Sequence, residues 1–255
     1  MCFFNSQNRR ALEIAKRYGR TDDVIELARG IIEEQKGWKD RSFGYAQDDN
    51  EGVTSGVVQK AFLNPDCFIV TRNPGLQTAK WGLIPFWVRE VKQAESMRKM
   101  TANARAETVF TQASFRDAIK KRRCLVPSTG FYEYHHLTPD PSPKERGGAV
   151  PFRLFLPDME IFSLAGVFEE WKNPETKETV RTFSVLTVEA NKLCAFIHNG
   201  GRHPGRMPAI IPASEEYLWL DPGLGEEEIR ALLKPYEAGE MKAVEMEKDY
   251  LRRAG

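Results

Sequence analysis

Long apolar runs are missing from this 255-residue chain: no stretch could span a bilayer, and none at the start resembles a signal segment. An excess of charge is missing too, because 37 basic and 36 acidic residues leave a net charge of +1. A basic surface over the whole molecule is therefore excluded, and any nucleic-acid site must be a local patch. We expect a cytoplasmic protein with no membrane partner.

Cysteine is scarce, with four residues in all, and no two of them are spaced as in a zinc site or a redox pair. Cys67, Cys124 and Cys194 lie in apolar surroundings, so we expect reduced thiols buried in the core. The sequence therefore offers no metal site.

Cys2 differs from the other cysteines because it follows the initiator methionine directly. Removal of Met1 would leave Cys2 with a free α-amine beside its thiol, and such a pair can close on an aldehyde as a thiazolidine. Reference pKa values of about 8 for the amine and about 8.5 for the thiol make both groups reactive near neutral pH. Position 2 considered alone favours the simpler interpretation, an ordinary small residue at a frayed terminus.

Apolar spacing predicts helices over residues 7–19, 22–35, 114–122 (with Ser114 as N-cap) and 226–233, and a helical turn over 190–197. Alternating apolar residues predict strands at 67–71, 123–127, 130–134, 152–156, 161–168, 182–188 and 207–211. Many strands with short helices indicate an α+β fold, a single domain built on a curved, mostly antiparallel β-sheet or barrel with peripheral helices.

We expect this domain to cover residues 1–235 and to be followed by a polar C-terminal tail, 236–255. Residues 36–56 are polar and follow no period, and residues 137–148 carry prolines at alternate positions. Both stretches are interpreted as surface insertions.

Four polar or aromatic stretches are candidates for chemistry. Asn103 and Arg105 alternate with alanines in residues 101–108, so their long side chains should project from a closely packed backbone; the alternative is a solvated turn or the start of a helix. Glu133 lies between aromatic residues that would raise its pKa, unless it faces solvent on an edge strand.

The third stretch is the glycine-rich loop at residues 196–208, which holds His198, His203 and Arg206. The fourth holds Trp81 and Trp87; at least one ring should be core, and an exposed one could stack on an unpaired base.

Together these motifs resemble the SRAP family (SOS response-associated peptidase, also called abasic site processing protein). The resemblance rests on the Met-Cys start and on residues 81–85, 103–108, 124–127, 130–133, 165–169 and 206–208. The chain departs from the family pattern at Phe4, where many members have arginine, in the two insertions, and in the residues inserted between His198 and Arg206.

The resemblance implies a monomeric protein that binds single-stranded DNA containing abasic sites, without a cofactor, and associates with the nucleoid when bound. It places the catalytic residues on Cys2, Asn103, Glu133 and His198, with His203 as the alternative histidine. Arg105 and Arg206 are expected to contact DNA phosphates, and Trp81 is expected to hold the bound DNA strand in a bent, unstacked form.

The reaction implied is a covalent thiazolidine crosslink between mature Cys2 and the ring-opened sugar aldehyde, with abasic-site lyase and autopeptidase activities as further possibilities. Two other hypotheses stay open. One is a thiol amidohydrolase or peptidase with an N-terminal nucleophile, which would form an acyl-enzyme. The other is a non-catalytic module for single-stranded DNA, in which Cys2 would be dispensable.

Overall fold

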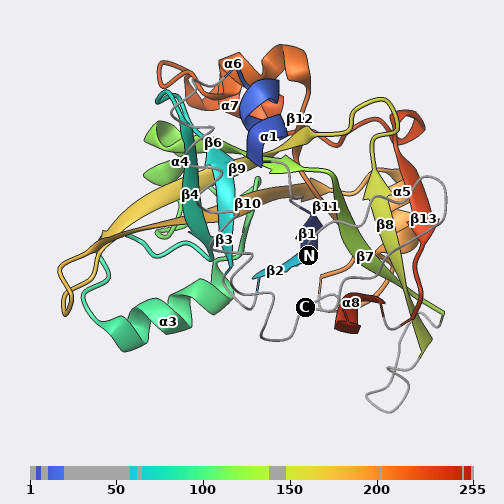
Figure 1. The fold of residues 1–255 in the computed structure, drawn as a ribbon, viewed down its shortest axis with the longest axis horizontal. Helices are drawn as coiled ribbons and strands as arrows, with labels where there is room; N and C mark the ends of the chain where they lie inside the picture. Colours follow the sequence, from blue (N-terminus) through green and yellow to red (C-terminus); the bar gives the residue numbers. More distant parts are fainter. Residues whose placement is uncertain are drawn as a thin grey trace.

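Two β-sheets lie side by side in the computed structural model, which describes residues 4–6, 11–19, 58–61, 65–137, 148–201, 203–248 and 250–253 (Figure 1). The smaller sheet has the strand order β13-β8-β7-β1-β2. Its strands are β1 (Phe4–Ser6), β2 (Val58–Lys60), β7 (Gly130–His136), β8 (Ala149–Phe155) and β13 (Lys242–Glu245).

The larger sheet follows the order β11-β10-β4-β3-β6-β9-β12, and β5 pairs with β10. Its strands are β3 (Asp66–Val70), β4 (Leu76–Trp81), β5 (Asn103–Arg105), β6 (Arg123–Ser128), β9 (Phe162–Lys172), β10 (Thr179–Glu189), β11 (Arg206–Pro208) and β12 (Ile210–Ile211). The pairings of β10 with β4 and with β5 are parallel, whereas the other described pairings are antiparallel. The predicted α+β fold on a curved, mostly antiparallel sheet is confirmed.

Short helices surround the sheets, and α1, α6 and α7 lie together at the top of Figure 1. The helices are α1 (Ala11–Arg17), α3 (Val91–Met100), α4 (Ala118–Lys121), α5 (Lys192–Ile197), α6 (Glu216–Trp219), α7 (Glu226–Leu232) and α8 (Tyr250–Arg253), with 3-10 turns η4 (Ala213–Glu215) and η5 (Ala238–Glu240). No helix in the described part of the chain is long and apolar enough to cross a bilayer.

The core joins both sheets through fully buried aromatic and aliphatic side chains, including Phe131, Phe162, Phe183 and Trp219. Gly166 of β9 lies where β6 and β10 approach from either side, opposite Cys124 and Val185. A Cβ at Gly166 would lie 2.8 Å from the sulfur of Cys124, so this position between β6 and β10 requires glycine.

Several sequence predictions need correction. The helix expected over 114–122 is only α4, and its N-cap is Asp117 instead of Ser114, because the preceding residues form successive turns. The apolar residues of 207–211 divide into two short strands, β11 and β12.

The described residues beyond 235, which are 236–248 and 250–253, do not form a polar tail. Strand β13 pairs with β8, and Tyr250 of α8 stacks on Tyr132 of β7. The sequence hides this because the strand is short and mostly exposed, so its polar side chains carry little apolar pattern. The helix predicted over 22–35, the insertion predicted over 36–56 and residues 138–147 of the second insertion lie outside the described residues.

Candidate functional site

Glu133 and His198 face each other between β7 and the end of α5. Glu133 is the fourth residue of β7, and His198 is the C-cap of α5. The carboxylate oxygen Oε2 of Glu133 lies 3.9 Å from Nε2 of His198, and each residue is only 6% exposed. Asn191 caps α5 by accepting the amide hydrogen of Cys194, which fixes the helix that delivers His198.

Burial acts on the two groups in opposite directions. It raises the pKa of Glu133 to about 7, because a charged carboxylate loses its hydration there. It also lowers the pKa of His198 to about 4, although a hydrogen bond to the carbonyl oxygen of Arg206 partly opposes that decrease. At neutral pH the imidazole is therefore uncharged and Glu133 is about half protonated, so the pair is not a permanent salt bridge.

The tautomer of His198 follows from its hydrogen bonds. Nδ1 lies 3.0 Å from the carbonyl oxygen of Arg206, which can only accept, so Nδ1 carries the proton. Nε2 is then a proton acceptor directed toward Glu133. A carboxylic acid and a basic imidazole nitrogen thus face each other across a gap longer than one hydrogen bond.

Asn199 links the loop after His198 to the strand that carries Glu133. Its Oδ1 accepts the amide hydrogen of His136 at 2.8 Å, and its Nδ2 donates to the carbonyl oxygen of His136 at 2.9 Å. The side chain thus satisfies both backbone groups of one β7 residue, as a neighbouring strand would. Sequence reasoning missed this residue, although its position directly after the candidate histidine was a usable signal.

The loop between His198 and Arg206 closes on itself, because the amide of Gly205 donates to the carbonyl oxygen of His198. Beyond that closure, Nδ1 of His203 lies 2.8 Å from Nη2 of exposed Arg105. The structure therefore brings His198 to Glu133, whereas it brings His203 to the end of β5.

Arg206 is engaged with Glu107 through two hydrogen bonds of 2.6 and 3.0 Å, and it also donates to the carbonyl oxygen of Thr187. Burial alone would raise the pKa of Glu107, but the hydrogen bonds and charge of Arg206 bring that pKa below its ordinary value. A phosphate at Arg206 would have to compete with this carboxylate.

Asn103 begins β5 and is buried, with 8% of its surface exposed. It pairs with Val185 of β10, two residues before Arg105 pairs with Thr187. Arg206, at the end of the loop that follows His198, contacts Thr187 of β10 and Glu107 just after β5. These contacts connect that loop to the strand that carries Asn103.

Trp81 is not available to DNA, and that expectation is corrected. Its side chain is 1% exposed, it stacks on Phe183, and its indole nitrogen donates to the carbonyl oxygen of Ala102. The exposed rings of this stretch are Phe86, at 49%, and Trp87, at 36%, in the turn before α3. The sequence of a dense aromatic segment does not show which rings face the core and which face solvent. Only the folded structure shows that Trp81 is buried and Trp87 is exposed.

The three internal cysteines are free, buried thiols, as predicted. Burial raises the pKa of Cys194 to about 12 and raises those of Cys67 and Cys124 further above the ordinary range, so none is a reactive thiolate at neutral pH. Cys2 lies outside the described residues. No cluster of metal-binding side chains occurs within the part of the chain that the structure describes.

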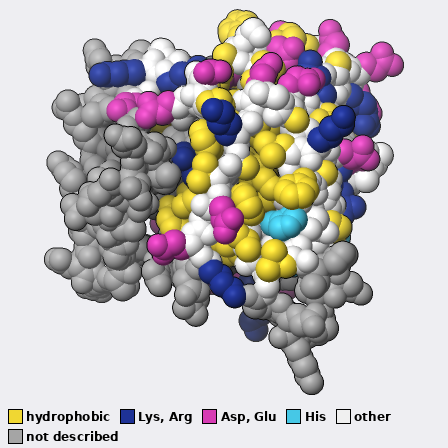
Figure 2. Space-filling model, turned by 90° about the vertical axis from the view of Figure 1, so that its right-hand side faces the viewer, with side chains coloured by type: hydrophobic (Ala, Val, Ile, Leu, Met, Phe, Trp, Pro, Cys, Tyr) yellow, Lys and Arg dark blue, Asp and Glu magenta, His cyan; other side chains and the backbone are white. Residues whose placement is uncertain are grey.

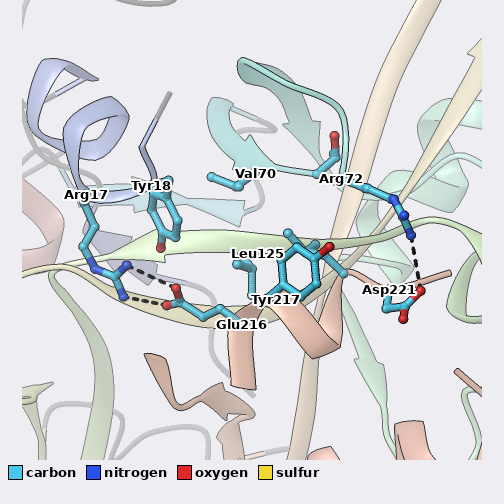
Figure 3. A pocket seen from close by; sticks show the side chains of 10 residues that line it. Arg17, Tyr18, Val70, Arg72, Leu125, Glu216, Tyr217 and Asp221 are labelled. Atoms are coloured by element: carbon cyan, nitrogen blue, oxygen red, sulfur yellow. Dashed lines mark hydrogen bonds and ion pairs between the residues drawn. The ribbon is translucent and has the colours of Figure 1, made fainter. Parts of the chain in front are cut away.

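A cavity of about 310 Å³ opens elsewhere, between α1, β3 and α6 (Figure 3). Arg17 forms two hydrogen bonds with Glu216 at one end, and Arg72 pairs with Asp221 at the other. The cavity contains none of the predicted catalytic residues. Because each arginine is already matched by a carboxylate, the cavity has no evident preference for an anion.

Comparison with known proteins adds an independent line of evidence. The chain is similar to abasic site processing protein YoqW of Bacillus subtilis, with 34% identity over 175 residues, which is 68% of this chain and 70% of that protein. Abasic site processing protein HMCES of Gallus gallus is 28% identical over 166 residues, 57% of this chain and 45% of that protein.

Among solved structures, a Bacteroides thetaiotaomicron protein superposes with a TM-score of 0.80 at 37% identity, covering 98% of this chain and 94% of that one. A Bordetella bronchiseptica protein shares the fold at a TM-score of 0.69 and 22% identity, covering 96% of this chain and 100% of that one. The family model described as SOS response associated peptidase (SRAP) matches residues 1–250. The chain therefore belongs to the SRAP family.

Proposed function

We propose that this protein processes abasic sites in single-stranded DNA by forming a covalent thiazolidine between Cys2 and the sugar aldehyde. The observation that carries the proposal is the buried pair of Glu133 and His198, 3.9 Å apart, in which burial raises the pKa of the carboxyl to about 7. A carboxyl of that pKa is suited to general acid catalysis. The names of the relatives YoqW and HMCES support the same substrate.

The start of the described chain pairs with the strand that carries Glu133. Strand β1 begins at Phe4, which pairs with Tyr132, the residue before Glu133. The proposal requires mature Cys2, two residues before Phe4, to meet the sugar beside this part of β7. The three buried thiols are no substitutes, because their pKa values are raised.

The reaction proceeds in three covalent steps. The neutral α-amine of Cys2 attacks C1′ of the ring-opened sugar, and the aldehyde oxygen becomes the hydroxyl of a carbinolamine. Protonated Glu133 donates a proton to this hydroxyl, which leaves as water and gives an iminium ion. The thiol of Cys2 then gives its proton to the Glu133 carboxylate and its sulfur attacks the same carbon, which closes the thiazolidine, restores protonated Glu133 and leaves the nitrogen as a neutral secondary amine.

The other residues have supporting roles in this scheme. His198 accepts a hydrogen bond from the sugar hydroxyl at Nε2, because its Nδ1 proton is held by the carbonyl oxygen of Arg206. Asn103 positions the amine or the sugar from β5. Arg105 contacts a phosphate beside the lesion, and Trp87 takes the stacking role first expected of Trp81.

The same intermediate accounts for two finer activities. An imine next to a 3′ phosphate permits β-elimination, which would appear as weak lyase activity. The mature N-terminus requires removal of Met1, and self-cleavage there would be an autopeptidase reaction. The protein is proposed to act as a monomer in the cytoplasm, on the nucleoid when DNA is bound.

The experiment is incubation with single-stranded DNA containing one abasic site, followed by a denaturing gel. Wild-type protein should give a heat-stable shifted band, and C2A or N-terminally acetylated protein should give none. E133Q is run in the same assay to test the acid role of Glu133. E169Q serves as its control, because Glu169 is equally buried but paired with Arg122 away from the site. A band of undiminished intensity with C2A would refute the scheme and leave the non-catalytic DNA-binding module as the better description.

A further inference from the structure

The ring of Phe196 is 65% exposed, although it lies on α5 only two residues before buried His198. It stacks on the imidazole of His135, with ring centroids 4.9 Å apart and planes inclined by 26°. Nδ1 of His135 also donates to the carbonyl oxygen of Phe196 at 2.9 Å. The hydrogen bond fixes the His135 imidazole on the backbone of α5, and the Phe196 ring stacks on that imidazole.

The ring pair is continuous with the catalytic pair along the sheet. Glu133 and His135 are two residues apart on β7, so their side chains share one face and lie about 7 Å apart along the strand. Phe152 of β8 lies directly opposite Glu133, and its ring meets the imidazole of His135 edge to face at 6.3 Å. Rings therefore extend from the catalytic carboxyl to the surface.

Hydrophobic side chains gather around a histidine on the side of the molecule formed by β7, β8, β13 and α5 (Figure 2). An exposed apolar patch usually marks a binding surface. This patch borders a site proposed to act on unpaired DNA, which favours a nucleobase as its occupant.

We propose that Phe196, supported by His135, is a stacking platform for the base adjacent to the abasic sugar. This inference rests on the proposed function. Because the lesion has no base of its own, its neighbour has lost a stacking partner on one side and offers a free π face. An aromatic ring one nucleotide away from the reacting carbon can supply that partner, and it does so for any of the four bases.

The test uses DNA with a tetrahydrofuran abasic analogue, which cannot react, and the fluorescent base 2-aminopurine on either side in turn. Stacking on Phe196 should quench the fluorescence on one side when wild-type protein binds, and F196A should remove the quenching. F196A should also weaken binding about tenfold. Y217A is the matched control, because Tyr217 is an 84% exposed aromatic residue on α6, and it should behave as wild type.

A second comparison replaces the flanking base with another tetrahydrofuran unit. Wild-type protein should then bind about as weakly as F196A binds the DNA that keeps its flanking base. The affinity of F196A should not fall further when that base is removed. Additive losses, or full recovery of binding by F196L, would overturn the platform and point to a plain apolar contact surface for a protein. Crosslinking to a reactive abasic site is measured in parallel, so failure of the proposed function appears separately, as absence of adduct with wild-type protein.

Discussion

Oε2 of Glu133 lies 3.9 Å from Nε2 of His198, and burial brings the pKa of the carboxyl to about 7 and that of the imidazole to about 4. The usual order of proton affinity is thereby reversed, because an exposed histidine titrates above an exposed glutamate. An acid and a base therefore coexist in uncharged form at neutral pH, which is the condition that the proposed dehydration step needs.

The rate of crosslinking should depend on pH through Glu133. Below pH 7 the rate should rise with pH, because more of the Cys2 amine becomes neutral. It should bend downward near pH 7, where loss of the Glu133 proton offsets that gain, and it should fall above about pH 8. E133Q should be slower by about 10²- to 10⁴-fold, and its rate should rise with pH without the downward bend. Single-turnover rates from pH 5.5 to 9 measure this, and an unchanged bend in E133Q would assign it to another group.

The stability of the fold should depend on pH through the same residue. The folded pKa of Glu133 lies above the unfolded value, so its contribution is fully present below about pH 4.5 and is lost as pH rises through about 7. E133Q should therefore gain stability relative to wild type between pH 5 and 8, by an amount on the order of 3 kcal/mol. Urea unfolding of wild type and E133Q at pH 5 and at pH 8 measures the difference.

His198 contributes with the opposite sign. Its folded pKa is lowered to about 4, so the stability it contributes is complete above about pH 6.5 and declines as pH falls toward 4. H198F should therefore lessen the loss of stability on acidification below pH 6.5. Equal acid sensitivity in wild type and H198F would show that other groups dominate that range.

Asn199 should act as a positioning residue. N199A removes both hydrogen bonds to His136, and it should slow crosslinking and displace the pH of the downward bend, because Glu133 and His198 would no longer be held at one separation. Asn173 is a matched control, since its Oδ1 also accepts two backbone hydrogen bonds, in the β9–β10 turn. A loss of stability alone, with the bend unmoved, would reduce Asn199 to a structural role.

Glu107 should limit phosphate binding at Arg206. E107Q removes the competing negative charge, so single-stranded DNA should bind severalfold more tightly at low salt, and the dependence of log K on log salt should steepen by about 0.7. Binding titrations at several salt concentrations measure both quantities. An unchanged slope would mean that Arg206 serves only to hold the loop after His198.

Gly166 should tolerate no side chain. G166A places a methyl group against Cys124, Val126 and the carbonyl of Ser184, and the cost should be about 1–3 kcal/mol of unfolding free energy. Gly239 of η5 is the control, since a Cβ there meets nothing within 4 Å. Equal stabilities of the two variants would contradict the close approach of β6 and β10.

The strand-rich fold could be predicted from the sequence because β7, β9 and β10 are long enough to show the alternation of apolar residues. The sequence could not indicate β13, whose exposed side chains contribute little to the core, or the inward direction of Trp81. The aromatic neighbours of Glu133 were enough to predict it as a candidate catalytic residue. The sequence left His198 and His203 as alternatives, because only the hydrogen bonds of the folded loop show which one meets Glu133.

The most direct measurement is the mass of the DNA-linked peptide after protease digestion of the crosslinked protein. The account predicts an adduct on the peptide beginning at Cys2, lighter by one water than the sum of peptide and sugar fragment, with neither the amine nor the thiol open to alkylation. An adduct attached to any other residue, or a peptide that still retains Met1, would contradict it.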